Sequence, residues 1–221
     1  MSDHNIYVCS DWHIGHETVV ALGHRPVNFE DLLFDGLRAA NMRPGDVLLN
    51  LGDVYLYEGE ERVKEMLAWA KFNGISTVLT PGNHDSNRFG RLMRMGWSWV
   101  CDKISLTYHG KKFLFTHEPV ETPFEENFNV HGHLHQVDGH RGGLIRDGKH
   151  ILISMEMLRY RPIPLEVVAR LKETPMYVLG KFVGEGAQVG QGNIDGIGDV
   201  EEPEKARRNQ SAGDDGGNMR P

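Results

Sequence analysis

The sequence contains few cysteines, no long apolar run and no excess of positive charge. Its two cysteines, Cys9 and Cys101, allow one disulfide at most, and we expect free thiols. Neither belongs to a CxxC pair, so zinc ligation by cysteine is excluded. No apolar stretch approaches the roughly 20 residues of a membrane-spanning helix. The net charge of -7 makes nucleic acid a poor partner, because holding it requires a basic face.

The N-terminus also lacks the pattern of a leader sequence. Residues 1–5 lead directly into a strand-like run, without a basic segment followed by an apolar one. We therefore expect no signal peptide, a cytoplasmic location and no membrane association. The sequence leaves the oligomeric state open.

The length of the chain favours a single domain with a substantial core, followed by a tail. We predict a folded domain over residues 1–183. From about Gly180 the sequence is rich in glycine and acidic residues and poor in large apolar side chains. Such a segment cannot offset the entropy lost on ordering, so we predict a disordered tail over residues 184–221.

Hydrophobic periodicity predicts an α/β first half and a β-rich second half. The predicted strands are 6–10, 47–51, 75–80, 97–102, 104–108, 112–116, 128–131 and 150–155. The predicted helices are 18–22, 29–41, 60–72, 89–95 and 164–171. Residues 109–111 join two of the strands as a hairpin.

Five short segments supply acids, histidines and one asparagine in a fixed order. They are Asp11-Trp12-His13, Gly52-Asp53, Gly82-Asn83-His84-Asp85, His117 and Gly132-His133-Leu134-His135. Any one of them alone is a weak signal. Most directly follow a predicted strand, and the carboxyl ends of strands are where open α/β sheets form their sites. Together the segments predict a metal site.

The spacing of these residues indicates how they reach an ion. Asp11 and His13 are two residues apart at a strand end, so their side chains leave on the same side. His133 and His135 repeat that spacing. The carboxylate of Asp53 has two oxygens that can bridge two ions.

The mixture of ligands has an electrostatic consequence. Two divalent ions bring four positive charges, whereas Asp11, Asp53 and a bridging hydroxide return three. Histidine and asparagine ligands return none, so the site stays positive. A phosphoryl group that develops negative charge requires such a site, and four carboxylates would have neutralised it. The sequence therefore predicts a two-metal phosphoesterase.

The ordered set resembles the calcineurin-like metallophosphoesterase superfamily, whose pattern runs DxH, GD, GNH[DE], H, GHxH. Every element is present in order over residues 11–135. Residues 10–16, 25–26 and 160–165 look like a small bacterial and phage branch of it. The resemblance implies an α/β fold of two mixed β-sheets packed face to face and flanked by helices.

The resemblance also implies a role for each motif residue. One metal ion would be held by Asp11, His13 and His135, the other by Asn83, His117 and His133, with Asp53 bridging. A hydroxide between the ions would attack phosphorus in line. His84 would act as the general acid, oriented by Asp85. Mn²⁺ is the first expectation for the metal, and Fe, Zn²⁺, Ni²⁺ and Co²⁺ are alternatives.

Two further residues are candidates for contact with the substrate. His16 follows the first motif closely and could contact either the substrate or a metal ligand, although a helix-start position explains it equally well. Arg25 carries a planar fork that suits a phosphate group. The continuation after Asp53, residues 54–57, lacks the VDRG of protein Ser/Thr phosphatases, so we expect a small phosphodiester or phosphomonoester, such as a nucleotide.

Two other functions remain as alternatives. A Mn²⁺-dependent nuclease of the same superfamily is disfavoured by the short chain, the acidic balance and the lack of an added capping domain. A non-catalytic binding module on the same fold is disfavoured by His84, because such members typically lack the general acid.

Overall fold

The structure is a computed structural model of the 221-residue chain. It describes residues 4–21, 25–85, 89–120, 127–135, 150–156, 158–171, 177–178 and 181–182. The predicted tail, 184–221, lies outside the described residues, so its disorder stays a prediction.

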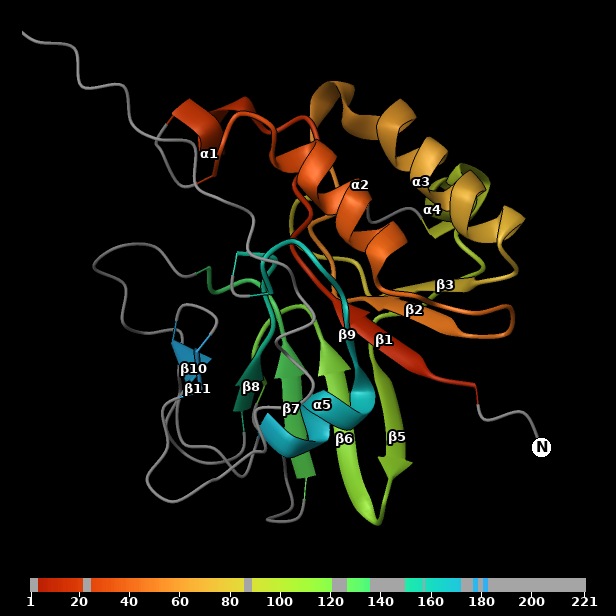
Figure 1. The fold of residues 1–221 in the computed structure, drawn as a ribbon, viewed down its shortest axis with the longest axis vertical. Coiled ribbons are helices and arrows are strands. Elements are labelled where there is room, and N and C mark those ends of the chain that lie inside the picture. The colour runs from red at the N-terminus through yellow and green to blue at the C-terminus, as the bar shows by residue number, and fades with distance from the viewer. Residues whose placement is uncertain are drawn as a thin grey trace, which may run out of the picture. The chain divides into compact units, whose positions relative to one another are not determined.

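The first sheet contains five strands in the order β4-β3-β2-β1-β9 (Figure 1). These strands are β1 (Ile6–Cys9), β2 (Val47–Asn50), β3 (Ser76–Leu79), β4 (Trp99–Val100) and β9 (Ile163–Pro164). The first four run parallel, and β9 pairs antiparallel with β1. Because β1, β2 and β3 are parallel neighbours, their carboxyl ends meet at one edge of the sheet.

The second sheet contains four strands in the order β5-β6-β7-β8. They are β5 (Ile104–Tyr108), β6 (Lys111–Thr116), β7 (Asn127–His131) and β8 (His150–Leu152). The predicted hairpin joins β5 to β6 through His109 and Gly110, whose φ angles of 47° and 76° suit a tight two-residue turn. Strands β6, β7 and β8 run parallel.

Helices flank the sheets, which confirms the predicted fold class of two mixed sheets with flanking helices. The helices are α1 (Glu17–Ala21), α2 (Phe29–Ala39), α3 (Glu60–Phe72), α4 (Phe89–Met95), α5 (Leu165–Leu171) and the 3-10 turn η1 (Tyr57–Gly59). Figure 1 shows α2, α3 and α4 on one side of the first sheet and the second sheet on its other side. The short strands β10 (Tyr177–Val178) and β11 (Lys181–Phe182) pair only with each other among the described residues.

One apolar cluster joins the two sheets. It contains Val8 and Leu49 from the first sheet and Phe113, Phe115 and Val130 from the second, each at most 2% exposed. Such close-packed interiors resist deformation, so this core fixes the strand ends of one sheet relative to those of the other.

Two simple expectations can be compared directly with the structure. Cys9 and Cys101 are both free, as predicted. Within the described part of the chain, no helix combines the length and the apolar character needed to cross a membrane.

Candidate metal centre

The loops that follow β1 and β2 remain paired beyond the ends of the strands. The backbone N–H of Asp11 donates to the carbonyl of Gly52 at 2.8 Å, and that of His13 donates to the carbonyl of Asp53 at 2.9 Å. This pairing brings the DxH and GD motifs side by side. On the second sheet, the N–H of Gly132 donates to the carbonyl of His117 at 2.9 Å, which joins the loops after β6 and β7 in the same way.

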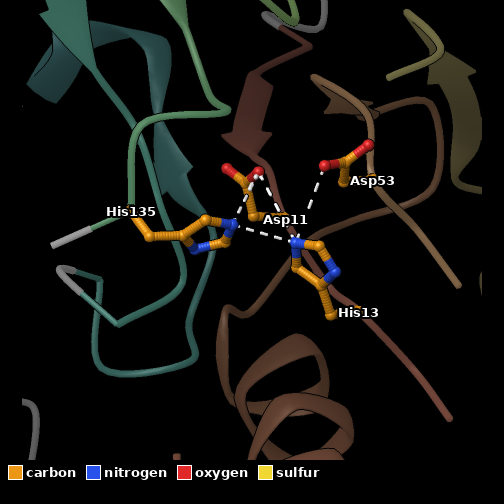
Figure 2. A group of neighbouring side chains, drawn as sticks. All are labelled: Asp11, His13, Asp53 and His135. Carbon is orange, nitrogen blue, oxygen red and sulfur yellow. Dashed lines mark hydrogen bonds and ion pairs between the residues drawn. The ribbon is translucent and has the colours of Figure 1, made fainter. Parts of the chain in front are cut away.

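A first group of ligand atoms comes from Asp11, His13, Asp53 and His135 (Figure 2). The Nε2 atoms of His13 and His135 are 2.9 Å apart, and His135 Nε2 lies 3.5 Å from Asp11 Oδ1. All four ligand atoms lie within 4.8 Å of one another. Metal–ligand bonds of about 2.0–2.3 Å let atoms with this spread bind one ion.

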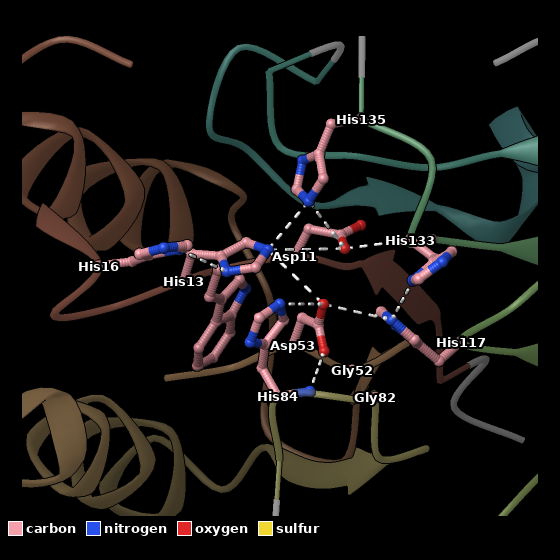
Figure 3. Close-up of polar contacts among 12 residues, drawn as sticks. Asp11, His13, His16, Gly52, Asp53, Gly82, His84, His117, His133 and His135 are labelled. Carbon is pink, nitrogen blue, oxygen red and sulfur yellow. Dashed lines mark hydrogen bonds and ion pairs between the residues drawn. The ribbon is translucent and has the colours of Figure 1, made fainter. Parts of the chain in front are cut away.

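A second group comes from Asp53, His117 and His133 (Figure 3). Asn83 Oδ1 lies 3.1 Å from His117 Nε2 and 2.9 Å from His133 Nδ1. Asp53 Oδ2 is 3.3 Å from His117 Nε2 and also 3.7 Å from His13 Nε2 in the first group. One carboxylate oxygen therefore lies between the two groups.

The outer nitrogens of three histidines show that the donor set fits divalent metals. The outer nitrogen is Nδ1 in all three. Nδ1 of His13 lies 3.2 Å from His16 Nδ1, and Nδ1 of His117 lies 2.7 Å from the carbonyl of Leu51. Nδ1 of His135 lies 3.1 Å from Glu156 Oε1. A neutral imidazole has one N–H and one lone pair, so an outer N–H that donates leaves the lone pair on the inner Nε2. Lone pairs that face one another suit a shared cation, which makes the arrangement a metal centre.

Glycine is required beside the ligands because there is no room for a side chain. Gly52 has a φ of +101°, and a Cβ there would lie 2.6 Å from the nitrogen of Gly82 and 2.7 Å from His117 Nδ1. A Cβ at Gly132 would lie 2.6 Å from Asp11 Oδ2. The predicted GD and GHxH motifs therefore depend on their glycines for close approach of the chain segments.

The backbone is strained at the ligands themselves. Asp11, His13, Asp53 and His133 have φ angles of 54°, 51°, 53° and 68°. Non-glycine residues rarely adopt this left-handed region, and such strain concentrates at functional sites. Half of the eight non-glycine residues recorded with positive φ are predicted metal ligands, so strain and ligand position coincide here.

The carboxylates at the centre differ in acidity. Burial raises the pKa of Asp11 to about 6, because the charged form loses its hydration. Burial would also raise the pKa of Asp53, but the hydrogen bond and charge of His117 outweigh it and lower that pKa to about 2. Burial would lower the pKa of His117, yet Asp53 raises it to about 9. The metal-free site therefore holds an ion pair between Asp53 and His117.

Comparison with known proteins identifies the family of the chain that carries these two groups. The model of the calcineurin-like phosphoesterase family matches residues 4–185. The chain belongs to this family. It is a metal-dependent phosphoric ester hydrolase, as the order of the five motifs predicted.

Individual relatives cover most of this phosphoesterase. The uncharacterized protein MJ1445 of Methanocaldococcus jannaschii is 29% identical over 181 residues, which are 78% of this chain and 94% of that protein. A structure of AQ665, a protein of unknown function from Aquifex aeolicus, is 24% identical with a TM-score of 0.62, covering 76% of this chain and 100% of that one. YfcE, a phosphoesterase from E. coli, is 14% identical with a TM-score of 0.41, covering 68% and 78%.

His84 of the phosphoesterase lies beside Asp53 and His13 (Figure 3). Its Nε2 is 4.0 Å from Asp53 Oδ2, and its side chain is 37% exposed. Its backbone N–H donates to Asp53 Oδ1 at 2.9 Å. The imidazole is therefore close to the metal groups and accessible from solvent, which fits its predicted contact with a substrate.

Asp85 does not have the contacts that were expected of it. We expected it to orient His84, but its hydrogen bonds are with the backbone N–H groups of Gly82, Asp53 and Val54, at 2.8, 2.8 and 2.9 Å. The carboxylate is 7% exposed, and a buried carboxylate requires donors around it. Asp85 thus fixes the loops after β2 and β3 to each other.

Arg25 also differs from the sequence-based expectation. We expected a clamp on substrate phosphate, but its side chain is fully buried and its guanidinium binds Glu156 and two backbone carbonyls. A buried cation needs such partners, because it has lost its hydration. Arg25 therefore binds the backbone of the loop that carries Asp11 and His13. His16 does reach the centre, but through His13, and their ring centroids are 5.2 Å apart.

Glu156 is the functional residue that sequence reasoning missed. It belongs to no motif, yet its carboxylate contacts the predicted ligand His135 at 3.1 Å. Burial would raise the pKa of Glu156, but hydrogen bonding by His135 and the charge of Arg25 lower it. One signal was present, since Glu156 directly follows the predicted strand 150–155, as the ligands follow theirs.

Proposed function

We propose that this phosphoesterase hydrolyses a small phosphodiester or phosphomonoester, such as a nucleotide, with two divalent metal ions bridged by Asp53. The observation that carries the proposal is the position of Asp53 Oδ2, 3.7 Å from His13 Nε2 and 3.3 Å from His117 Nε2. Mixed nitrogen and oxygen donors suit Mn²⁺, Fe, Zn²⁺, Ni²⁺ and Co²⁺ alike, so availability decides among them, and Mn²⁺ is our first expectation.

The two groups of side chains would divide the ligands between the ions. Asp11, His13 and His135 would hold one, and Asn83, His117 and His133 the other. Bound ions would supply Lewis-acid polarisation of the phosphoryl oxygens and a more acidic attacking water. The loops of the two sheets keep both groups at a fixed separation, which positions the ester between them.

His84 would donate a proton to the leaving oxygen. Its exposed imidazole lies beside Asp53, and a general acid must reach the leaving group directly. His16 would orient His13, whose Nδ1 it contacts at 3.2 Å. The residues after Asp53 support a small substrate, because positions 54–57 lack the VDRG sequence of protein Ser/Thr phosphatases.

Activity of metal-loaded variants tests this proposal. Asp53→Ala and His135→Ala should reduce hydrolysis of an aryl phosphate monoester and an aryl phosphate diester with Mn²⁺ to background. Glu166→Gln is a matched control, because it removes an exposed carboxylate that pairs with Arg170 on α5. Unchanged activity in both ligand variants would show that the proposal is wrong.

The same preparation separates the small-ester function from the nuclease alternative. Single-stranded DNA incubated with the Mn²⁺-loaded protein should remain intact. A ladder of fragments would make nucleic acid the substrate instead.

A further inference from the structure

The imidazole of His135 contacts a carboxylate that belongs to none of the five motifs. Its Nδ1 lies 3.1 Å from Glu156 Oε1, while its Nε2 faces His13 at 2.9 Å. An imidazole that donates from Nδ1 to a carboxylate carries its lone pair on Nε2. The contact therefore determines both the tautomer of His135 and the direction of its ring.

Glu156 is itself held by Arg25. The Nε and Nη2 atoms of Arg25 donate to Glu156 Oε1 at 2.8 and 2.6 Å. The two side chains are 0% and 16% exposed, so this ion pair lies inside the protein. Two donors from one planar guanidinium fix the position of the carboxylate as well as neutralising it.

The same guanidinium supports the loop that carries the other ligands of the first group. Arg25 Nη2 donates to the carbonyl of Asp11 and Nη1 to that of Trp12, both at 2.6 Å. Left-handed backbone, present in this loop at Asp11 and His13, persists only when its surroundings hold it. Arg25 thus connects this strained loop with the carboxylate that orients His135.

We propose that Glu156 and Arg25 act as a positioning pair for the metal group that contains His135. The inference rests on the proposed two-metal function. The pair supplies no ligand atom, and it acts by directing His135 Nε2 and by holding the DxH loop. His117 in the second group is oriented by the Leu51 carbonyl, so losing the pair affects one metal site and spares the other.

Titration of metal-stripped, full-length protein with Mn²⁺, followed by electron paramagnetic resonance of the free ion, tests the pair. Glu156→Ala should weaken one of two Mn²⁺ sites roughly 10–100-fold, as loss of such an outer partner typically does. Glu156→Gln retains an acceptor oxygen for His135 and should recover most of the affinity. Arg25→Lys should weaken the same site, because an ammonium cannot bind the carboxylate and both carbonyls together.

Two comparisons identify the affected site. In a His117→Ala background the His135 group is the remaining site, and Glu156→Ala should lower its affinity by the same factor. Glu166→Gln, on the surface of α5, should leave both sites unchanged. Thermal melting of each metal-free variant, measured by circular dichroism, reports folding separately from metal binding.

Each other outcome has a distinct meaning. Wild-type affinity at both sites in Glu156→Ala and Arg25→Lys would overturn the inference and leave the two-metal function standing. Equal weakening of both sites, without rescue by Glu156→Gln, would show that the pair has only a general structural role. That result would also overturn the inference. If Glu156→Ala does not fold, the Mn²⁺ affinities of Glu156→Gln and Arg25→Lys test the positioning role instead. A wild-type protein that binds no metal would instead refute the proposed function.

Discussion

Asp53 combines contacts with three residues, which follow β1, β3 and β6. Its Oδ2 faces His13 and His117, and its Oδ1 accepts the backbone N–H of His84. The GD motif predicts Asp53 as a ligand, and the structure places its carboxylate between the two groups of predicted ligands. The partners of Asp85 and Arg25 were not predictable, because sequence position does not give the direction of a side chain.

The charge of the metal-free centre predicts a pH dependence of stability. The folded-state pKa of His117 is raised from 6.5 to about 9, so its stabilising ion pair with Asp53 is complete below pH 6.5 and lost as the pH rises through 9. Urea unfolding of chelator-treated protein between pH 6.5 and 9 should show the free energy of unfolding falling. The decline should be smaller in His117→Gln, and equal slopes in the two proteins would contradict the assigned pair.

The proposed role of His84 as a proton donor predicts a dependence on the leaving group. In His84→Ala, hydrolysis of an alkyl phosphate ester should fall by roughly 10²–10⁴-fold, the usual contribution of a general acid. An aryl ester, whose phenolate leaves without a proton, should lose much less. Initial rates on the two esters measure this difference, and equal losses would assign His84 a role other than proton donation.

The glycine next to Asp53 predicts a contrast between two substitutions. Gly52→Ala should destabilise the protein and disrupt metal binding, since its Cβ would collide with the nitrogen of Gly82 and with His117. Gly110→Ala also places alanine at positive φ, but nothing lies within 4 Å of that Cβ. It should cost only about 1–2 kcal/mol and leave Mn²⁺ binding intact. Denaturant unfolding and Mn²⁺ titration compare them, and similar metal affinities would contradict the close approach.

At the scale of elements, long periodic segments were predicted well, whereas the ends of strands and the short strand β9 were not. The bounds of α3, α4 and β5 are the predicted ones. The predicted strand 97–102 shortens to β4 (Trp99–Val100), because the end of a strand depends on how far its neighbour pairs with it. β9 was missed because it has two residues and includes a proline, which strands accept only at an edge.

The connection between β2 and β3 predicts the effect of removing Asp85. Asp85→Ala leaves three backbone N–H groups without their acceptor, and each buried donor left unsatisfied costs about 1–3 kcal/mol. The total loss of stability should therefore be several times that of Asp35→Ala, which removes a 74% exposed carboxylate on α2. Equal losses in denaturant unfolding would show that Asp85 does not hold the two loops together.

At the scale of the whole molecule, two bound metal ions would give this acidic protein one positively charged centre. The net charge is -7, yet two bound divalent ions would leave the centre positive for an anionic ester. The order of motifs along the chain predicted this centre because the first three motifs follow the parallel neighbours β1, β2 and β3, whereas the last two follow β6 and β7 of the second sheet. Substrate choice depends on walls that the motif pattern does not describe.

Metal binding should also stabilise the whole fold. An ion that binds only the folded state adds about 2.7 kcal/mol at a concentration 100 times its dissociation constant. Melting with Mn²⁺ should therefore occur at a higher temperature than melting with a chelator. Asp53→Ala should lose most of this difference, and an unchanged shift in that variant would place the metals elsewhere.

The proposed function depends most on two metal ions that share Asp53. Elemental analysis combined with electron paramagnetic resonance of the Mn²⁺-loaded protein measures the number of ions and their magnetic coupling together. We expect two Mn²⁺ per chain with the spectrum of a coupled pair, and loss of the coupling in Asp53→Ala. One ion per chain, or two ions with the spectrum of isolated Mn²⁺, would contradict it.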